Sequence, residues 1–163
     1  MNDWSVCTAW LFTNNKYYLL NILRERLEHP ALKNAVISNT DRWSTNLVLI
    51  EGVNARIALI QELKTSTNLD IYTVIHKDDK VMRVTVESLA IAAGKVYMPK
   101  EADWLATFQR EAVLFPKDKH DDQIDSMSQF LKWAHHRQPA MQQLTCIVTP
   151  CYSEPPDLNF NEW

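Results

Sequence analysis

The sequence predicts an α/β fold in which a mixed β-sheet is flanked by helices. Two observations carry this prediction: strand-like runs alternate with segments of helical periodicity after an initial pair of strands, and 46% of the 163 residues are hydrophobic. A chain of this length and composition can bury the core of one ordinary domain. We expect that domain over residues 1–138, followed by a C-terminal tail over residues 139–163.

Ten elements are expected, and the first of them form a hairpin. Two runs of aromatic and β-branched residues flank Asn14 and Asn15, and asparagine-rich connections of this length favour a β-hairpin. Pro30 suits the first turn of the helix that follows. The strands are expected at residues 4–12, 17–23, 46–51, 70–75 and 95–98, and the helices at residues 31–43, 55–64, 79–93, 104–115 and 123–136.

The middle of the chain shows strand and helix signals in turn. Residues 46–51 form a continuous apolar run of the kind found in a strand buried on both faces. Asn54 can cap the next helix. Asp78 or Asp79 can start the third helix, and Gly94 can end it as the residue after the last turn.

The segment of residues 120–125 carries the strongest chemical signal. It places His120 and three carboxylates, Asp121, Asp122 and Asp125, at the start of a helix, with Asp122 and Asp125 on one face. Clustered carboxylates repel one another unless a cation lies between them, and hard oxygen ligands suit Mg²⁺ or Mn²⁺. A simpler explanation stays open, in which Asp121 caps the helix while Asp122 and Asp125 complement its dipole.

A second acid stands where ligands bind in open α/β sheets. Glu51 ends the apolar run of residues 46–51, and the carboxyl ends of the strands form the binding edge of such a sheet. We therefore expect Glu51, Asp122 and Asp125 to converge on one cleft. The alternative is an exposed carboxylate that meets solvent or caps the next helix.

Composition excludes several classes of protein. The net charge of −3 provides no global basic field for nucleic acid, so any such contact must be local or mediated by metal ions. The two glycines cannot form either glycine-rich nucleotide-binding motif. Cys7, Cys146 and Cys151 lack the spacing of a zinc site or a disulfide framework. Without a signal peptide or a membrane span, we expect a cytoplasmic protein.

Seven motifs occur in a distinctive order, at residues 2–7, 17–20, 23–28, 47–51, 79–83, 94–99 and 120–126. Together they closely resemble the C-terminal nuclease domain of terminase large subunits from tailed phages. The resemblance covers residues 2–136. It implies a prophage-encoded protein in a bacterial host, with an RNase H-like fold that cuts concatemeric double-stranded phage DNA during packaging. It also implies the portal protein and the terminase small subunit as partners.

The same resemblance assigns roles to the acids. It implies two divalent ions, Mg²⁺ or Mn²⁺, held by Glu51, Asp121, Asp122 and Asp125, with Glu51, Asp122 and Asp125 as the catalytic residues. Such an ion pair stabilises the attacking and leaving oxygens of an in-line displacement.

Three further residues are candidates for contact with DNA. Lys80 and Arg83 lie at i and i+3 on one helix, so both could meet a phosphate backbone, and His120 could position a water or a phosphate. The alternatives are a solvated helix start for Lys80 and Arg83 and an ordinary loop histidine for His120.

The chain also departs from the family pattern. Members carry a first acidic motif on a strand just upstream of the region that matches Asn2, and an ATPase domain before it. We therefore expect an N-terminally truncated domain whose activity is impaired and whose strand edge at residues 47–50 or at the hairpin is unpaired. Residues 52–56 also differ from the family loop. The alternative functions are a catalytically inactive remnant that binds DNA or the portal, and another RNase H-like nuclease such as a resolvase.

Overall fold

The computed structural model describes residues 4–45, 47–52, 56–75, 79–117, 120–141 and 160–162. Its first element is the predicted antiparallel hairpin, formed by β1 (Ser5–Thr13) and β2 (Lys16–Glu25). Asn14 and Asn15 turn the chain with positive φ angles of 50° and 61°. Asparagine tolerates this left-handed backbone better than most residues, which explains why the asparagine pair marked the turn.

The two faces of the hairpin enter separate hydrophobic clusters. Side chains alternate between the faces of a strand, and here one set packs beneath helix α5 (Asp122–Met141) while the other packs with Trp43 and Tyr97. A register shift between Ala9 and Trp10 interrupts the regular pairing of the two strands. The set beneath α5 includes Trp10, Tyr17, Leu19 and Ile22, and the other set includes Ala9, Leu11, Tyr18 and Leu20.

A second unit follows the hairpin. Helix α1 (His29–Trp43) begins with Pro30 in its first turn, as predicted, and leads to β3 (Leu47–Glu51). Helix α2 (Ile57–Ser66) then carries the chain over to β4 (Asp70–Val74), which pairs with β3 in parallel. The cap expected at Asn54 lies outside the described residues.

The next segment returns the chain to the hairpin. Helix α3 (Lys80–Ala92) is capped by Asp79, whose carboxylate accepts hydrogen bonds from two first-turn amides at 3.0 and 3.3 Å. Gly94 follows the helix with a φ of 64°, so both ends match the prediction. Strand β5 (Val96–Pro99) pairs with β2 in parallel, and α4 (Leu105–Leu114) precedes the acidic helix.

Two described elements extend into residues 139–163, the segment expected as a C-terminal tail. Helix α5 continues past the domain boundary expected at residue 138, although proline at position 139 removes one backbone donor. Part of the expected tail forms β6 (Phe160–Glu162), which pairs with β5 in antiparallel orientation. The described part of the chain contains no helix long and apolar enough to cross a membrane.

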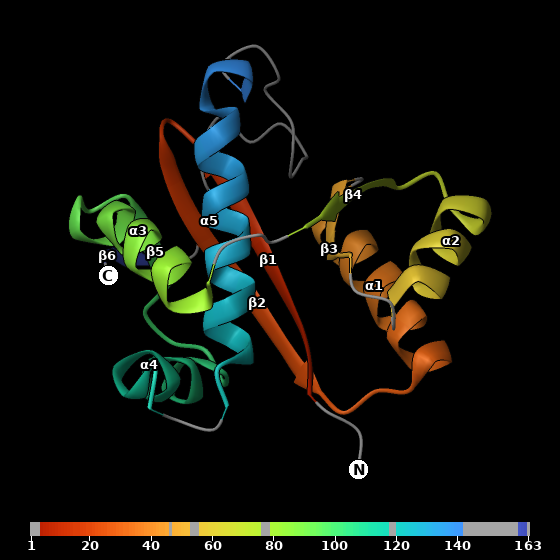
Figure 1. Ribbon diagram of the computed structural model, residues 1–163, viewed down its shortest axis with the longest axis horizontal. Coiled ribbons are helices and arrows are strands. Elements are labelled where there is room, and N and C mark those ends of the chain that lie inside the picture. Colours follow the sequence, from red (N-terminus) through yellow and green to blue (C-terminus); the bar gives the residue numbers. More distant parts are fainter. Residues whose placement is uncertain are drawn as a thin grey trace.

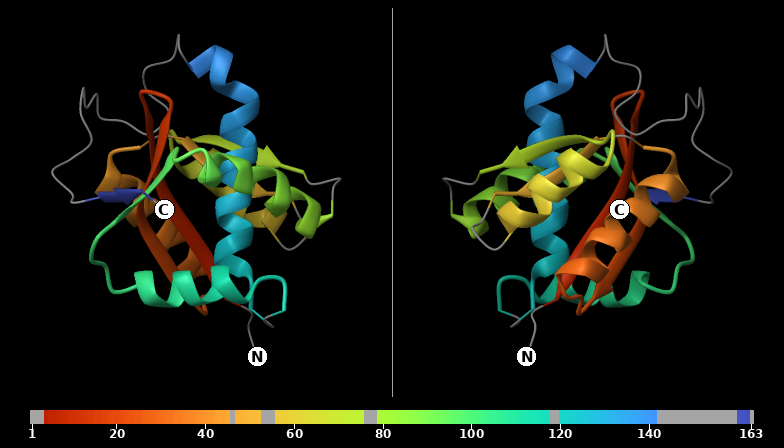
Figure 2. Two further views of the ribbon diagram at one scale, coloured as in Figure 1. Left: turned by 90° about the vertical axis from the view of Figure 1, so that its left-hand side faces the viewer. Right: turned by 90° about the vertical axis from the view of Figure 1, so that its right-hand side faces the viewer.

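The predicted mixed α/β fold, with its sheet flanked by helices, is confirmed. The strands nevertheless form two sheets rather than one: a mixed sheet in the order β1-β2-β5-β6 and a parallel pair, β3-β4. Helix α5 lies across the hairpin, with α3 and α4 on one side and the β3–β4 unit with α1 and α2 on the other (Figure 1, Figure 2). Strand β1 is the edge of the first sheet that faces the second unit.

Candidate functional site

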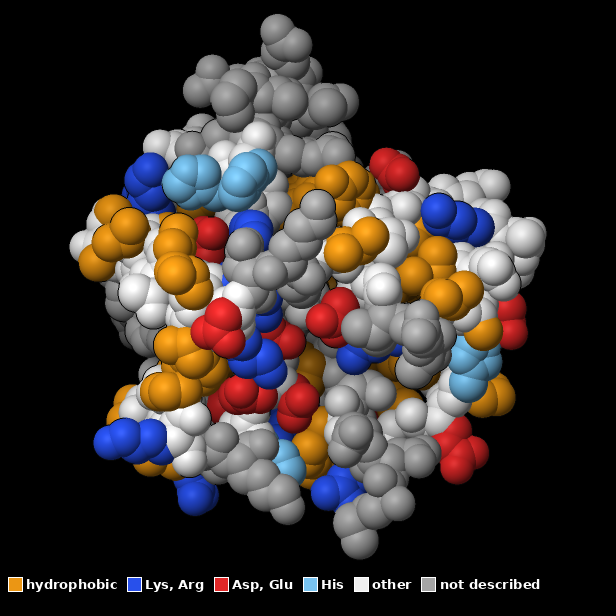
Figure 3. Space-filling model, in the orientation of Figure 1, with side chains coloured by type: hydrophobic (Ala, Val, Ile, Leu, Met, Phe, Trp, Pro, Cys, Tyr) orange, Lys and Arg blue, Asp and Glu red, His pale blue; other side chains and the backbone are white. Residues whose placement is uncertain are grey.

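A groove between the two sheets gathers the predicted acids. It is lined by β1, β3, α1 and one face of α5, and its volume of about 200 Å³ far exceeds the roughly 10–15 Å³ that a single water requires. Glu51, Asp122 and Asp125 all line it. The space-filling view shows acidic and basic side chains crowded between α5 and β3 (Figure 3). The expected convergence on one cleft is therefore found.

The start of α5 is held by a buried acid from α4. The Glu111 carboxylate accepts hydrogen bonds from the amides of Gln123 and Ile124 at 2.7 and 3.0 Å, and from the Gln123 side chain at 2.6 Å. Glu111 is only 4% exposed. This carboxylate satisfies amides that have no partner within the helix and places negative charge at the positive end of its dipole. It fixes the backbone that carries the acids.

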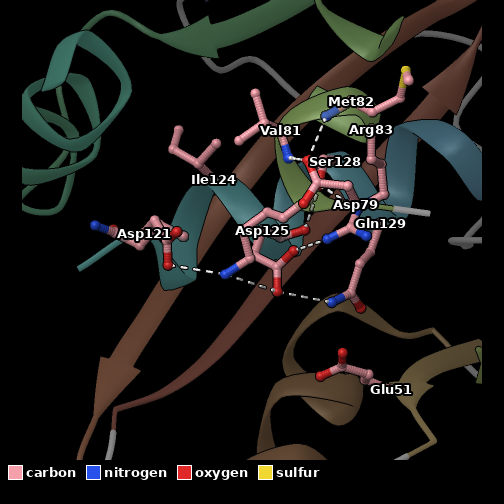
Figure 4. A network of polar contacts seen from close by, with 12 residues as sticks. Glu51, Asp79, Val81, Met82, Arg83, Asp121, Ile124, Asp125, Ser128 and Gln129 are labelled. Atoms are coloured by element: carbon pink, nitrogen blue, oxygen red, sulfur yellow. Dashed lines mark hydrogen bonds and ion pairs between the residues drawn. The ribbon is translucent and has the colours of Figure 1, made fainter. Parts of the chain in front are cut away.

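Asp125 is tied to α3 by a buried arginine. The Arg83 guanidinium donates to the Asp125 carboxylate and, at 3.1 Å, to the Ser128 hydroxyl. The Arg83 side chain is 3% exposed, and the Asp125 side chain is 17% exposed. Gln129 adds a weaker hydrogen bond to Asp125 at 3.4 Å (Figure 4). One carboxylate oxygen of Asp125 is therefore engaged by a buried cation.

Lys80 joins Asp121 to the same network. Its ammonium lies 3.0 Å from the Asp121 carboxylate and 3.7 Å from that of Asp125. Partial burial works against the charged form, but the hydrogen bond to Asp121 and the charges of Asp125, Asp121 and Asp122 raise the pKa of Lys80 above its usual value. Lys80 therefore stays charged and neutralises part of the acidic cluster.

The sequence left open whether Asp121 caps α5 with its side chain. In the structure its main-chain oxygen accepts from the Asp125 amide at 2.9 Å, but its carboxylate binds Lys80. The capping carboxylate belongs to Glu111. The Asp122 carboxylate, in contrast, has no hydrogen-bond or ion-pair partner among the described residues.

Glu51 approaches the groove from the other sheet. It ends β3 and pairs with Arg56 at 3.3 Å, with its side chain 25% exposed. The close-up shows Glu51 apart from the residues of α5 (Figure 4). Gly52 follows it so closely against β4 that a Cβ atom there would lie 2.6 Å from the Thr73 methyl group. Any larger residue at this position would therefore displace the Thr73 side chain where the strand leaves the site.

The structure places the candidate DNA contacts differently from one another. Arg83 is buried against α5, and the Lys80 side chain, 37% exposed, lies at the surface beside the acids. His120 is half-buried just before α5 and does not line the groove. Contact between DNA and any of these residues remains a prediction.

The fit of these residues to a metal ion is incomplete. Across the described ranges no group of three acidic, histidine or cysteine side chains lies close enough to hold an ion. Lys80 and Arg83 engage Asp121 and Asp125, while Glu51 stands apart with Arg56. The acids share a groove, but as placed they do not form a two-ion site.

Two features of the site were missed by sequence reasoning. Glu111 lies within a segment predicted only as a helix, and nothing in its neighbourhood indicates that its carboxylate caps α5. The i+3 spacing of Lys80 and Arg83 predicts a shared helix face that could meet DNA, but spacing alone does not show that Arg83 is buried. Both roles depend on long-range packing between helices.

Comparison with known proteins agrees with this architecture. The family model described as "Terminase RNaseH-like domain" matches residues 1–133 of the chain. A search of the curated proteins found no match.

Proposed function

Because the chain belongs to the terminase RNaseH-like domain family, which supports a terminase nuclease-type role, we propose that it acts in the cleavage of phage DNA concatemers during genome packaging. The proposed reaction is endonucleolytic hydrolysis of phosphodiester bonds in double-stranded DNA, dependent on Mg²⁺ or Mn²⁺. The observation that carries the proposal is the convergence of Glu51, Asp122 and Asp125 on one groove. Glu51 ends strand β3, whereas Asp122 and Asp125 lie on helix α5, so their presence in one groove is a property of the fold.

The three acids have different surroundings, which suggests different roles. The Asp122 carboxylate has no hydrogen-bond or ion-pair partner among the described residues and is the acid best placed to meet an incoming cation or substrate. The Asp125 carboxylate is oriented by Arg83, which also donates to the Ser128 hydroxyl, and the Glu51 carboxylate is oriented by Arg56. We therefore propose Asp122 as the principal acid, with Asp125 and Glu51 as its partners. Because the metal site is incomplete as placed, we expect weak ion binding and slow turnover.

The test is nicking of supercoiled plasmid by the purified chain in Mn²⁺ or Mg²⁺. Asp122→Asn removes the charge with little change in shape and should abolish nicking, whereas Asp103→Asn makes the same change at an exposed position outside the groove and should not. Binding of Mn²⁺ by each protein, followed by calorimetry, reports ion affinity without DNA. If the Asp122→Asn variant nicks plasmid as fast as the wild-type chain, the groove takes no part in the reaction.

A second candidate function is supported by the ion pairs. Lys80 and Arg83 form ion pairs with Asp121 and Asp125, so these two acids are neutralised without a metal ion. Such a chain would be catalytically inactive and would act as a module that binds DNA or the portal. Retention of duplex DNA in a gel-shift assay in EDTA, together with no nicking in any divalent ion, would favour this function over the first.

A further inference from the structure

Two arginines and a tryptophan form a basic cluster at one end of the groove. The guanidinium carbons of Arg24 and Arg26 lie 4.3 and 4.7 Å from the centre of the Trp4 ring. Trp4 lines the groove together with Asp122 and Asp125, whereas Arg26 is exposed. Trp4, Arg24 and Arg26, which we call the Arg–Trp cluster, therefore connect the groove of the acids with the outer surface.

The alternation of side chains along a strand places this cluster on the α5 side of the hairpin. Ile22 packs in the core beneath α5, and the two arginines follow it at intervals of two residues. Val6 pairs with Arg24 across the hairpin and packs against the same core, and Trp4 precedes Val6 by two residues. Both strands end near the first turn of α5 (Figure 1, Figure 2). The cluster therefore continues the α5 face of the hairpin beyond its apolar core.

Neither arginine of the cluster is neutralised. No ion pair joins Arg24 or Arg26 to a carboxylate in the part of the chain that the structure describes. The Nε atom of Arg24 is buried and has no hydrogen-bond acceptor there. Burial of a cation without an acceptor is unfavourable, and two like charges beside one ring repel each other. An anion that binds both guanidinium groups would offset both costs.

The cations that the sequence indicated for DNA are engaged elsewhere. Lys80 pairs with Asp121, and Arg83 pairs with Asp125. Binding of a phosphate by either cation would disrupt a pair within the protein and leave its carboxylate without a partner. The Arg–Trp cluster can bind a phosphate without this cost, because its charges are unpaired.

We propose that the Arg–Trp cluster binds the phosphate backbone of duplex DNA and positions the duplex beside the acids of the groove. A guanidinium can donate two parallel hydrogen bonds to a phosphate, and an indole ring can stack on its plane and hold it in place. Contacts to phosphates fix the position of a duplex without reading its sequence. The inference rests on the proposed action on DNA and identifies Arg24 and Arg26 as positioning residues for that substrate.

The test is binding of a fluorescent duplex oligonucleotide in EDTA, followed by anisotropy over a range of salt concentrations. EDTA removes divalent ions, so neither metal binding nor cleavage affects the result. The logarithm of the association constant falls with the logarithm of the salt concentration, with a slope of about 0.9 for each phosphate contact. This slope therefore counts the contacts that each variant has lost.

Removal of the arginines should reduce both the slope and the affinity. Arg26→Gln changes an exposed side chain and should lower the slope by about 0.9. The double variant with Arg24→Gln should lower it by about 1.8 and weaken binding at least about tenfold at roughly 0.1 M salt. The double variant with both arginines replaced by lysine should keep the wild-type slope but bind less tightly, because lysine does not donate in the bidentate manner.

A matched control is available on α1. Arg42 is exposed and also lies over an indole ring, 5.3 Å from the centre of Trp43. Trp43 packs with the cluster on the face of the hairpin that does not face α5. Arg42→Gln therefore removes one charge and one stacking contact, as Arg26→Gln does, but should leave the slope and the affinity unchanged.

Four results would overturn the proposal. They are no binding by the wild-type chain, an unchanged slope in the double glutamine variant, an equal loss of affinity in Arg42→Gln, and displacement of the duplex by polyglutamate as readily as by unlabelled duplex. The last would identify an acidic protein as the ligand. Asp122→Asn should bind the duplex at least as tightly as the wild-type chain, so failure of the nicking test and failure of this test are separate outcomes.

Discussion

Replacing Glu111 with glutamine should loosen the start of the acidic helix without changing the shape of the side chain. One carboxylate oxygen of Glu111 accepts from the amides of Gln123 and Ile124, and the other accepts from the Gln123 side chain. The substitution keeps one acceptor, turns the other into a donor that faces a donor, and removes the negative charge at the helix N-terminus. The cap is thus weakened in two ways.

The magnitude follows from those two losses. A hydrogen bond to a charged group contributes roughly 1.5–3 kcal/mol, and a charge at a partly buried helix end up to about 2 kcal/mol. If the side-chain amide of Gln123 flips, its oxygen accepts from the new donor, and only the loss of charge weakens the cap. We therefore expect Glu111→Gln to lower the free energy of unfolding by about 2–4 kcal/mol, which corresponds to roughly 5–15 °C in Tm for a chain of this size.

The assay is urea and thermal unfolding followed by circular dichroism, with hydrogen exchange of residues 122–125 as a local readout. Glu101→Gln makes the same substitution at an exposed loop position and should change the free energy of unfolding by less than about 0.5 kcal/mol. If Glu111→Gln is as mild as this control, the carboxylate does not hold the helix. The cap would then be irrelevant to the placement of the acids.

Three further predictions concern the other buried polar groups. Arg83→Met leaves the Asp125 carboxylate without its buried partner and should lower the free energy of unfolding in urea by about 3 kcal/mol. Adding Asp125→Leu should recover part of this loss. A double variant no more stable than Arg83→Met would contradict the pairing. Burial raises the pKa of Glu87 above 4.5, although nearby histidines and a lysine act in the opposite direction. Because the folded protein holds this proton more tightly than the unfolded chain, the wild-type protein loses stability as the pH rises from 4.5 through the folded-state pKa. Glu87→Gln should therefore be more stable than wild type at pH 7.5 but not at pH 4, and an equal difference at both pH values would refute this. Burial raises the pKa of the Cys7 thiol above 9.0, despite a hydrogen bond from Asn39. The rate of Cys7 alkylation in a single-cysteine variant should therefore have its pH midpoint above 9.0. A midpoint below that value would count against burial of the thiol.

Local signals predicted most elements of this fold correctly. The asparagine turn, Pro30 at the start of α1, and the pair of Asp79 and Gly94 around α3 each act through the backbone of a few neighbouring residues. Such signals can be recognised in the sequence because the physical cause lies within the same short segment. The apolar run before Glu51 predicted a strand with two covered faces, and both faces are indeed packed.

Long-range relationships were not predictable in the same way. The capping of α5 by Glu111, the burial of Arg83 and the pairing of β6 with β5 join residues that are distant in sequence. A single sequence contains no local pattern that specifies such partners. The family resemblance predicted an unpaired edge at residues 47–50 or at the hairpin, and among the described strands both β3 and β1 have one edge without a neighbour.

The geometry of the acids and the opening between the sheets are two aspects of one feature. Asp122 and Asp125 are fixed to the hairpin side of the molecule, through α3, α4 and the core beneath α5. Glu51 is fixed to the other side, through its strand pairing with β4. The groove lies between these two sides, and no strand among the described residues crosses it. The placement of Glu51 relative to the acids of α5 therefore depends on side-chain packing between the two sides, such as that of Leu47 and Leu49 against the cluster beneath α5, and not on shared strand pairing. The incomplete ligand set and the edges of β1 and β3 that lack a neighbour among the described strands thus lie along the same groove.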